Sequence, residues 1–426
     1  MLLEIAPELE DSAPGELNSS KLPLLKHVIM LSDSRIPGTH SYADLLDSVT
    51  SEHREEMHKI CSRMQFDAPV NVQFTSGTTG KPKGALLSHF NILNNSYATG
   101  RLVRYHEQHD SICLNVPLIH CFGCVIGTMC AMLFGSKIVM PAPSFNRAAA
   151  LKAISEQRCT TVYGTPTMFI DMMRELDAPS ALHDVSSVSK AIMAGAPCPP
   201  DVVKGAISKL NARQFHIGYG STECSPMITL SNPSEPLEKW ISTVGKPTEH
   251  VEVKVVDKEG RIVPFSTRGE LCARGYLVFL GYYGDERKTR EAVRNNWYHT
   301  GDEATMSEDG HVTITGRLKD MIIRGGENIY PQEIEEVLYT HPHVEEVQVC
   351  GVPDVRLGEE ACVWIKRRNG RSLEEEDVRS YCNEKLSHFK VPKYVMFVED
   401  FPKTLSGKIQ KFKMREESVR KLKLSE

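Results

Sequence analysis

The sequence "TSGTTGKPKG" runs from Thr75 to Gly84 and contains three glycines, four hydroxyl side chains and two lysines. Glycine exposes backbone amides, and the hydroxyl and ammonium groups add donors, so the composition suits a loop that holds phosphate. A Walker phosphate loop has four residues between its glycines, then Lys and Ser or Thr. Here two residues separate Gly77 from Gly80, and Pro82 follows Lys81. The stretch therefore predicts a phosphate-binding loop of another design; the alternative is a flexible surface turn.

The residues on either side of this loop predict strands and not a helix. "VNVQF" (Val70 to Phe74) alternates apolar and polar residues, as a strand does, and "GALLS" (Gly84 to Ser88) also favours an extended chain. Ser88 is a good N-cap, so we expect a helix to begin after it. The loop is thus expected in a strand–loop–strand element, without a helix N-terminus directed at the phosphates.

Length and composition restrict the classes of protein to consider. A chain of 426 residues is too long for one compact domain, and a hydrophobic content of 41% supports sizeable cores. The net charge of -5 gives no reason to expect nucleic-acid binding. No apolar run approaches the roughly 20 residues of a membrane span. The most apolar stretch, Cys124 to Gly135, predicts a short buried helix.

The twelve cysteines show no disulfide framework and are expected to be free thiols of a reducing compartment. Cys121 and Cys124 form a CxxC pair, but a zinc site would need a second pair at metal spacing. The first 20 residues are acidic and have neither the arginine-rich character of a transit peptide nor a secretory apolar core. They predict a loose tail.

The pattern of apolar runs changes along the chain and predicts an α/β protein. Short β-branched runs alternate with helical stretches in residues 70–242, which indicates a mostly parallel α/β layer, and several runs end in glycine loops, where such folds place ligands. Closely spaced strand signals in 243–316 predict a β subdomain. Residues 317–426 predict a small α+β domain, which the resemblance described below implies is mobile, and residues 1–69 form a weakly patterned N-terminal segment.

Four further motifs follow the opening loop in order. They are "YGSTE" (219–223), "YHTGD" (298–302), "GRLKDMIIRGGENIYPQEIE" (316–335) and "PKTLSGKIQK" (402–411). Together with the loop they resemble the adenylate-forming superfamily of acyl-CoA synthetases, adenylation domains and luciferases. The resemblance covers residues 70 to 415, and "PLIHCFG", "AGAPCPP", "STVGKP" and "HFKVPK" are most similar to fatty acyl-CoA ligases, in particular mitochondrial, medium-chain ones.

The chemistry of this superfamily explains the residue types. A fatty acid attacks the α-phosphate of ATP and releases pyrophosphate, and the thiol of CoA then displaces AMP from the acyl-adenylate. Because the substrate is its own nucleophile, the protein has to orient the reactants and neutralise charge around phosphorus. Amides, hydroxyls, lysines and Mg²⁺ do this work.

The resemblance assigns a role to individual residues. Lys408 would bridge the carboxylate and the α-phosphate, Thr222 would contact the α-phosphate, and Glu223 would hold Mg²⁺. Tyr219 would stack near adenine, while Asp302, assisted by Arg317, would accept hydrogen bonds from the ribose hydroxyls. The loop that covers the β- and γ-phosphates comprises Thr75, Ser76, Gly77, Thr78, Thr79, Gly80, Lys81, Pro82 and Lys83.

Other assignments from the resemblance concern the fatty acid, CoA and the hinge. His120 would gate the acyl pocket, or be a satisfied core histidine. Gly195 and Gly218 would shape an acyl tunnel, Gly325 and Gly326 would admit pantetheine, and Lys319 falls at the hinge. The basic cluster Lys366, Arg367 and Arg368 contacts the CoA phosphates or forms a solvated turn.

Superfamily members have a longer segment before the opening loop than the 74 residues found here, so we expect a shortened form. Three functions stay open from the sequence. The first is an ATP-dependent fatty acid–CoA ligase, and the second is adenylation for another acceptor. The third is a non-catalytic isoform that binds nucleotide or a partner.

Overall fold

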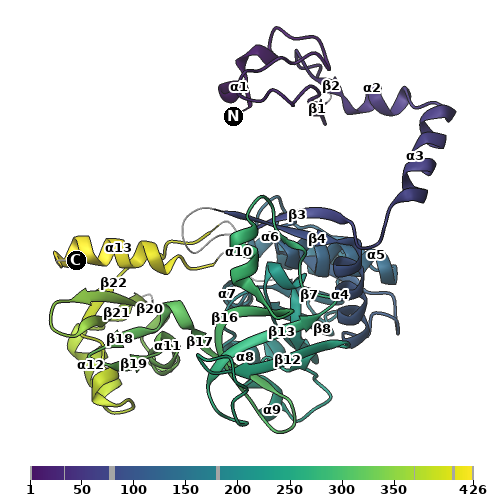
Figure 1. Ribbon diagram of the computed structural model, residues 1–426. Coiled ribbons are helices and arrows are strands. Elements are labelled where there is room, and N and C mark those ends of the chain that lie inside the picture. Colours follow the sequence, from purple (N-terminus) through teal and green to yellow (C-terminus); the bar gives the residue numbers. More distant parts are fainter. Residues whose placement is uncertain are drawn as a thin grey trace. The chain divides into compact units, whose positions relative to one another are not determined.

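The computed structural model describes residues 2–32, 34–75, 82–178, 183–368, 370–404 and 408–424 (Figure 1). The chain divides into two compact units, one ending at Phe66 and one beginning at Asp67. The expected α/β class is confirmed, because the second unit combines a largely parallel central sheet with helices.

The first unit is small and contains little regular structure. Ala6, Leu9 and Leu17 form a buried cluster, so the expectation of a loose tail over the first 20 residues was wrong. Its elements are α1 (Leu2–Ile5), η1 (Pro7–Leu9), the parallel pair β1 (Ile29–Met30) and β2 (His40–Ser41), α2 (Tyr42–Asp47) and α3 (Ser51–Arg63).

A seven-stranded sheet forms the centre of the second unit. Its strands, in spatial order, are β11 (Lys246–Pro247), β10 (Met227–Leu230), β9 (Gln214–Gly220), β8 (Lys190–Ala194), β7 (Thr161–Gly164), β5 (Ser111–Leu114) and β6 (Lys137–Val139). The strands from β9 to β6 are parallel, as the alternating pattern predicted, and β10 and β11 are antiparallel additions. Successive side chains enter two different cores, since Ile192 packs in one cluster and Ala191 and Met193 in the other.

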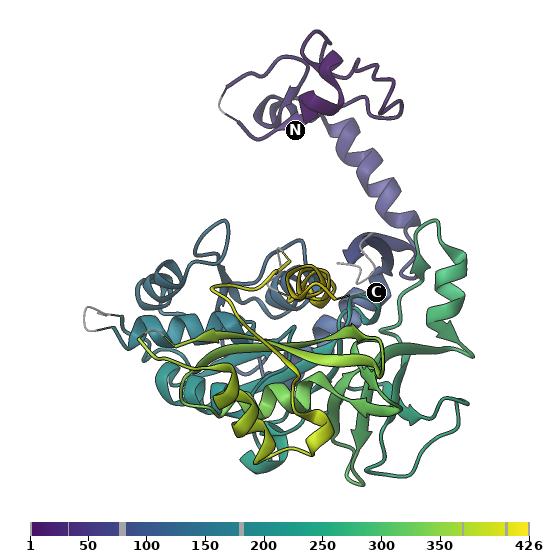
Figure 2. The ribbon, with the colours of Figure 1, turned by 90° about the vertical axis from the view of Figure 1, so that its left-hand side faces the viewer.

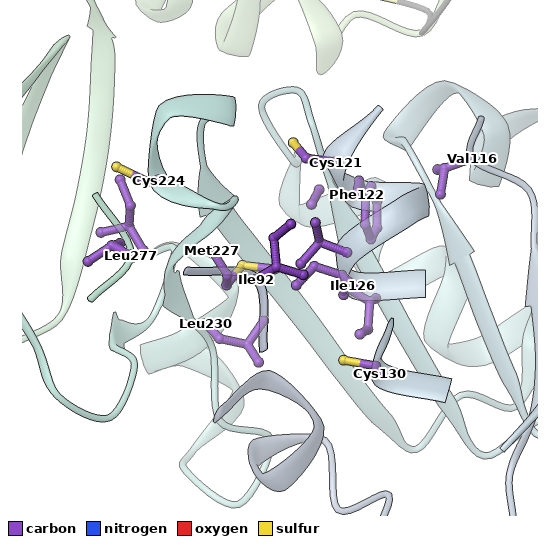
Figure 3. Close-up of a cluster of buried hydrophobic side chains, with 14 of the residues drawn as sticks. Ile92, Val116, Cys121, Phe122, Ile126, Cys130, Cys224, Met227, Leu230 and Leu277 are labelled. Atoms are coloured by element: carbon purple, nitrogen blue, oxygen red, sulfur yellow. The ribbon is translucent and has the colours of Figure 1, made fainter. Parts of the chain in front are cut away.

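Helices between these strands complete both cores. They are α4 (His89–Leu102), the π-helix η2 (Phe122–Met129), α5 (Cys130–Phe134), α6 (Arg147–Gln157), α7 (Pro166–Leu176), α8 (Pro200–Leu210), η3 (Thr222–Cys224) and α9 (Leu237–Ile241). The apolar run from Cys124 is helical as expected but not wholly buried, because Met132 is 71% exposed. Figure 3 shows Ile92 of α4, Phe122 and Ile126 of η2 and Met227 of β10 in one cluster.

Two smaller sheets belong to the same unit. One joins β3 (Pro69–Thr75), β4 (Lys83–Ser88) and β14 (Gly281–Tyr282). The other contains β12 (Val251–Val256), β13 (Gly269–Gly275), β15 (Val293–Arg294), β16 (Trp297–Met306) and β17 (Val312–Arg317), with α10 (Glu286–Ala292) before β15.

The C-terminal elements have a sheet and a core of their own. They begin with η4 (Leu318–Asp320) and comprise β18 (Ile322–Arg324), β19 (Glu327–Ile329), α11 (Pro331–Tyr339), β20 (Val344–Asp354), β21 (Gly358–Arg367), α12 (Glu375–Asn383), η5 (His388–Lys390), β22 (Tyr394–Phe397) and α13 (Lys411–Leu422). Figure 2 shows α13 almost end-on.

The expected free thiols are confirmed, since all twelve cysteines are unpaired and most are buried. Within the described ranges, no helix has the length and apolar character that crossing a membrane requires.

Candidate active site

The opening motif lies between two antiparallel strands, as predicted. Thr75 is the last residue of β3, Lys83 is the first of β4, and the two are register partners. The next helix, α4, begins only after Ser88, whose side chain caps it together with Asn91. The loop residues Ser76 to Lys81 lie outside the described residues. Among the residues that are described, the buried Thr75 hydroxyl has no hydrogen-bond partner, which leaves it available to a ligand at the start of the loop.

A chain of polar contacts connects the opening motif to the "YGSTE" motif. The Lys83 ammonium donates to the Tyr282 hydroxyl at 3.0 Å, and this hydroxyl donates to Glu223 Oε1 at 2.7 Å. Lys83 also lies 4.2 Å from the centroid of the Tyr282 ring. Burial, reinforced by the Glu223 carboxylate, raises the pKa of Tyr282, so this phenol remains a hydrogen-bond donor. Tyr282 therefore holds Glu223 in place relative to β4, the strand that follows the predicted phosphate-binding loop.

The donor set around Glu223 fits Mg²⁺. Glu223 is 8% exposed and lies in η3, directly after the end of β9. Mg²⁺ in nucleotide sites uses one or two carboxylates together with phosphate oxygens and waters. One Glu223 oxygen accepts from Tyr282, and a carboxylate retains further lone pairs for an ion. Mg²⁺ held there would neutralise phosphate charge.

Tyr219, Asp302 and Arg317 come together at the same end of β9, because Tyr219 is its penultimate residue. The Tyr219 hydroxyl donates to Asp302 Oδ2 at 2.7 Å, and Arg317 Nε lies 3.2 Å from Asp302 Oδ1. Asp302 of β16 and Arg317 of β17 are register partners. Burial raises the pKa of Asp302, while the Arg317 charge and the Tyr219 hydrogen bond oppose that rise. The carboxylate is thus a partly desolvated acceptor suited to hydroxyl donors.

Lys408 belongs to the C-terminal elements, yet its charge acts on this site. The Lys408 ammonium contributes to lowering the pKa of His120 to about 4, although burial of the imidazole is the larger cause. Burial also lowers the pKa of Lys408, with Arg317 as the next cause and Glu223 and Asp302 opposing. The backbone of Lys408 is held by Thr404, whose hydroxyl accepts from Lys408 N at 3.1 Å. Lys408, Glu223 and Asp302 therefore influence one another despite their separation in sequence.

His120 is uncharged at neutral pH because of its lowered pKa. The backbone N–H of Phe122 donates to His120 Nδ1 at 3.1 Å, which leaves Nε2 to carry the proton. The neighbouring Cys121 is buried, its sulfur lies 3.6 Å from the Thr222 hydroxyl, and burial raises the pKa of its thiol to about 12. Cys121 is therefore a protonated thiol that packs beside Thr222.

Gly218 of the expected acyl tunnel and the three basic residues expected at CoA have neighbours within the chain. A Cβ at Gly218 would lie 2.8 Å from the Met227 thioether, so Met227 occupies the space that this glycine leaves (Figure 3 shows Met227). Gly195 has a φ of +89° and an opening bounded by Thr165. Lys366 forms an ion pair with Glu345, Arg367 lies over the Phe397 ring, and Arg368 donates to the Val344 carbonyl.

One group among the described residues has the spacing of metal ligands, and it is not the CxxC pair. Glu270, Cys272 and His299 place their ligand atoms within 4.8 Å of one another. Their atoms already satisfy one another, because His299 Nδ1 lies 2.7 Å from Glu270 Oε2 and 3.4 Å from Cys272 Sγ.

Two surface cavities, of about 440 and 410 Å³, share no lining residue with the candidate site.

The sequence did not identify Tyr282 or Glu270 as site residues. Tyr282 lies in "GYYG", a pair of tyrosines between glycines, and its partners are about 60 and 199 residues away in sequence. A glycine-flanked aromatic pair is the only local signal, and it does not indicate those partners. Glu270 lies in "RGE", a turn followed by a strand, which gives no functional signal at all.

Comparison with known sequences agrees with this geometry. The profile of the AMP-binding enzyme family matches residues 11–283, and that of the AMP-binding enzyme C-terminal domain matches residues 333–408. A mitochondrial medium-chain acyl-CoA ligase of Danio rerio is 46% identical over all of this chain, which covers 70% of the relative.

Two solved structures share the fold. The crystal structure of an anthranilate CoA ligase in complex with anthranoyl-AMP has a TM-score of 0.83 and 25% identity, covering 95% of this chain and 76% of that one. ATP-bound MatB from Rhodopseudomonas palustris has a TM-score of 0.76 and 29% identity, covering 83% of this chain and 69% of that one.

Proposed function

The chain belongs to the AMP-binding enzyme family, and we propose that it activates a medium-chain fatty acid with ATP and transfers it to CoA. The products are acyl-CoA, AMP and pyrophosphate, and the intermediate is an acyl-adenylate. One observation carries the proposal: a lysine, a carboxylate fit for Mg²⁺ and a carboxylate fit for ribose are brought to one site from three distant segments. The first is Lys408, the second Glu223 and the third Asp302.

The proposed roles follow the positions of these groups. Lys408 stabilises the negative charge that develops between the fatty-acid carboxylate and the α-phosphate, with Thr222 as a neighbouring donor. Glu223 binds Mg²⁺, and the Thr75–Lys83 loop covers the β- and γ-phosphates. Asp302 and Arg317 hold the ribose, and Tyr219 lies beside the adenine. Neutral His120 separates this polar site from the acyl pocket and adds no charge to it.

The medium-chain preference and a mitochondrial location are proposals that rest on the named relative from Danio rerio. Met227 supports a limited chain length, because it fills the space beside Gly218 at the apolar cluster. An acyl chain that enters there has to displace a flexible thioether side chain, which costs less than displacing backbone.

A pyrophosphate-release assay tests the proposed function. Octanoate with ATP and Mg²⁺ should release pyrophosphate, and CoA should convert the adenylate into octanoyl-CoA detected by mass spectrometry. Pyrophosphate without thioester would indicate another acceptor, and no pyrophosphate with any fatty acid would favour a non-catalytic role. Lys413→Ala, at an exposed lysine five residues after Lys408, is the matched control for Lys408→Ala and should retain full activity.

A further inference from the structure

The residues that present Asp302 form a bulge in strand β16. Glu270 of β13 pairs with Glu303, and Cys272 pairs with His299. Between these pairs β13 has Leu271 alone, whereas β16 has Thr300, Gly301 and Asp302. Two extra residues therefore project from β16, and Gly301 has a φ of +70°, which favours glycine. Bulges of this kind redirect side chains beside active sites, and this one carries Asp302.

Three side-chain hydrogen bonds hold the bulge. Gly301 N donates to Glu270 Oε1 at 3.1 Å, so the carboxylate takes the backbone N–H that the bulge removes from the ladder. The Thr300 hydroxyl donates to the Leu271 carbonyl at 2.8 Å and accepts from Asp302 N at 3.0 Å. Glu270 and Thr300 thus satisfy the backbone on both sides of Gly301.

Glu270 is itself held in place. Its second oxygen, Oε2, lies 2.7 Å from His299 Nδ1 and 3.4 Å from Arg294 Nη2, and only 17% of the side chain is exposed. A partly buried carboxylate with defined partners on both oxygens has little freedom to move. Its position therefore determines where the Gly301 peptide lies, and through that peptide where Asp302 begins.

We propose that Glu270 is a positioning residue that, with Thr300, holds the β16 bulge so that Asp302 is preorganised for the two ribose hydroxyls of ATP. The inference rests on the proposed function, in which Asp302 binds ribose. Glu270 touches neither nucleotide nor fatty acid, and it acts through the backbone of Gly301. Its contribution should appear only with nucleotides that have ribose hydroxyls.

Calorimetric titration of the full chain with ATP and with 2′,3′-dideoxy-ATP, both with Mg²⁺, tests the proposal. Glu270→Ala should weaken ATP binding roughly tenfold, the loss typical of one charge-assisted hydrogen bond, and leave dideoxy-ATP binding unchanged. In the octanoate assay the KM for ATP should rise by a similar factor while kcat changes little. Glu252→Ala is the matched control, since Glu252 lies on the adjacent strand β12, is exposed and forms an ion pair with Arg274.

Two further variants make each outcome decisive. Glu270→Gln keeps an acceptor for Gly301 N but cannot accept at both positions, so it should give an intermediate loss if Glu270→Ala does not fold. Equal weakening of ATP and dideoxy-ATP would mean a general structural role and would overturn the proposal. Asp302→Ala should abolish the preference for ATP over dideoxy-ATP. A preference that survives in Asp302→Ala would refute the ribose assignment itself, whereas its loss there but not in Glu270→Ala would refute the role of Glu270 alone.

Discussion

Asp302, the proposed ribose ligand in the core, and Lys408, which comes from the C-terminal elements, are held in place by different kinds of contact. Asp302 has partners on its own strand β16, on the adjacent strand β17 and on β9 of the central sheet, from which Tyr219 donates to it at 2.7 Å. The C-terminal elements contact the core through ion pairs with exposed arginines. Arg174 of α7 reaches Glu345 at 3.0 Å and is 44% exposed, and Arg268 reaches Glu333 at 2.6 Å and is 40% exposed. Asp302 is thus held by hydrogen bonds within the core, whereas the contact with the C-terminal elements combines ion pairs of partly exposed arginines with one hydrogen bond, from the Tyr330 hydroxyl to Glu303 Oε1 at 2.7 Å.

This difference fits a reaction with two chemical steps. ATP and then the adenylate occupy the same core site throughout, so rigid positioning of ribose benefits both steps. In the proposed mechanism Lys408 acts only while the α-phosphate is attacked, and a contact that depends largely on partly exposed ion pairs can be broken afterwards. Lys319, which we propose as the hinge, lies in η4, between β17 of the core and β18 of the C-terminal sheet. Rotation there would exchange the Lys408 face for another.

Replacing Lys408 should change the rate of adenylation more than any other substitution that tests this difference. Lys408→Ala should lower pyrophosphate exchange by about 10²–10³-fold, since one preorganised charge contact typically contributes this much. It should spare the attack of CoA on octanoyl-adenylate supplied from outside. The two half-reactions are measured separately, with Lys413→Ala as the control. An equal loss in both would show that Lys408 does not act on the α-phosphate.

Restricting the proposed hinge should have the second largest effect on the reaction rate. It should slow transfer to CoA and leave adenylation nearly unchanged, the reverse of the effect of Lys408→Ala. Lys319→Pro holds φ near -65°, so it should trap the adenylating arrangement. Adenylate formation should stay near normal, while transfer to CoA should fall about 10²-fold because the thiol cannot reach a correctly oriented acyl group. Octanoyl-adenylate is expected to accumulate and can be quantified by mass spectrometry. A variant that makes thioester at the normal rate would remove the hinge role from Lys319.

The pH dependence of adenylation should come from Lys408 and not from the core. Burial lowers the pKa of Lys408, so the ammonium loses its proton at a lower pH than an ordinary lysine. Pyrophosphate exchange should therefore fall as pH rises through that lowered pKa, by about tenfold per pH unit beyond it. Lys408→Arg should retain its charge and move the alkaline limb upward. An unchanged limb in Lys408→Arg would assign it to another group.

Local elements of this protein could be predicted from its sequence, whereas contacts between distant strands could not. The strand before Thr75, the strand from Lys83 and the cap at Ser88 follow from local patterns, and the structure confirms them. The contacts of Tyr282 and Glu270 could not be predicted, because they depend on which strands become neighbours. β14 pairs with β4 although about 200 residues separate them, and the bulge at Asp302 exists only because β13 lies opposite. Local sequence specifies strands and caps, whereas partners across a sheet depend on the whole fold.

Weakening the contact between the core and the C-terminal elements should have the smallest effect on the reaction rates. Arg174→Gln removes the Glu345 ion pair between core and C-terminal elements, and a partly exposed pair contributes about 0.2–1 kcal/mol. The ratio of adenylation to thiolation rates should thus fall by up to about fivefold, because only the adenylating arrangement loses the pair. Arg147→Gln is the matched control, since its pair with Glu175 joins α6 and α7 within the core and should leave the ratio unchanged. Raising the salt concentration should reduce the ratio in the unmutated chain and in Arg147→Gln, and less in Arg174→Gln, which has lost the Glu345 pair but retains the Arg268–Glu333 pair. If Arg147→Gln and Arg174→Gln change the ratio equally, the arginine at the contact does not hold Lys408 in place.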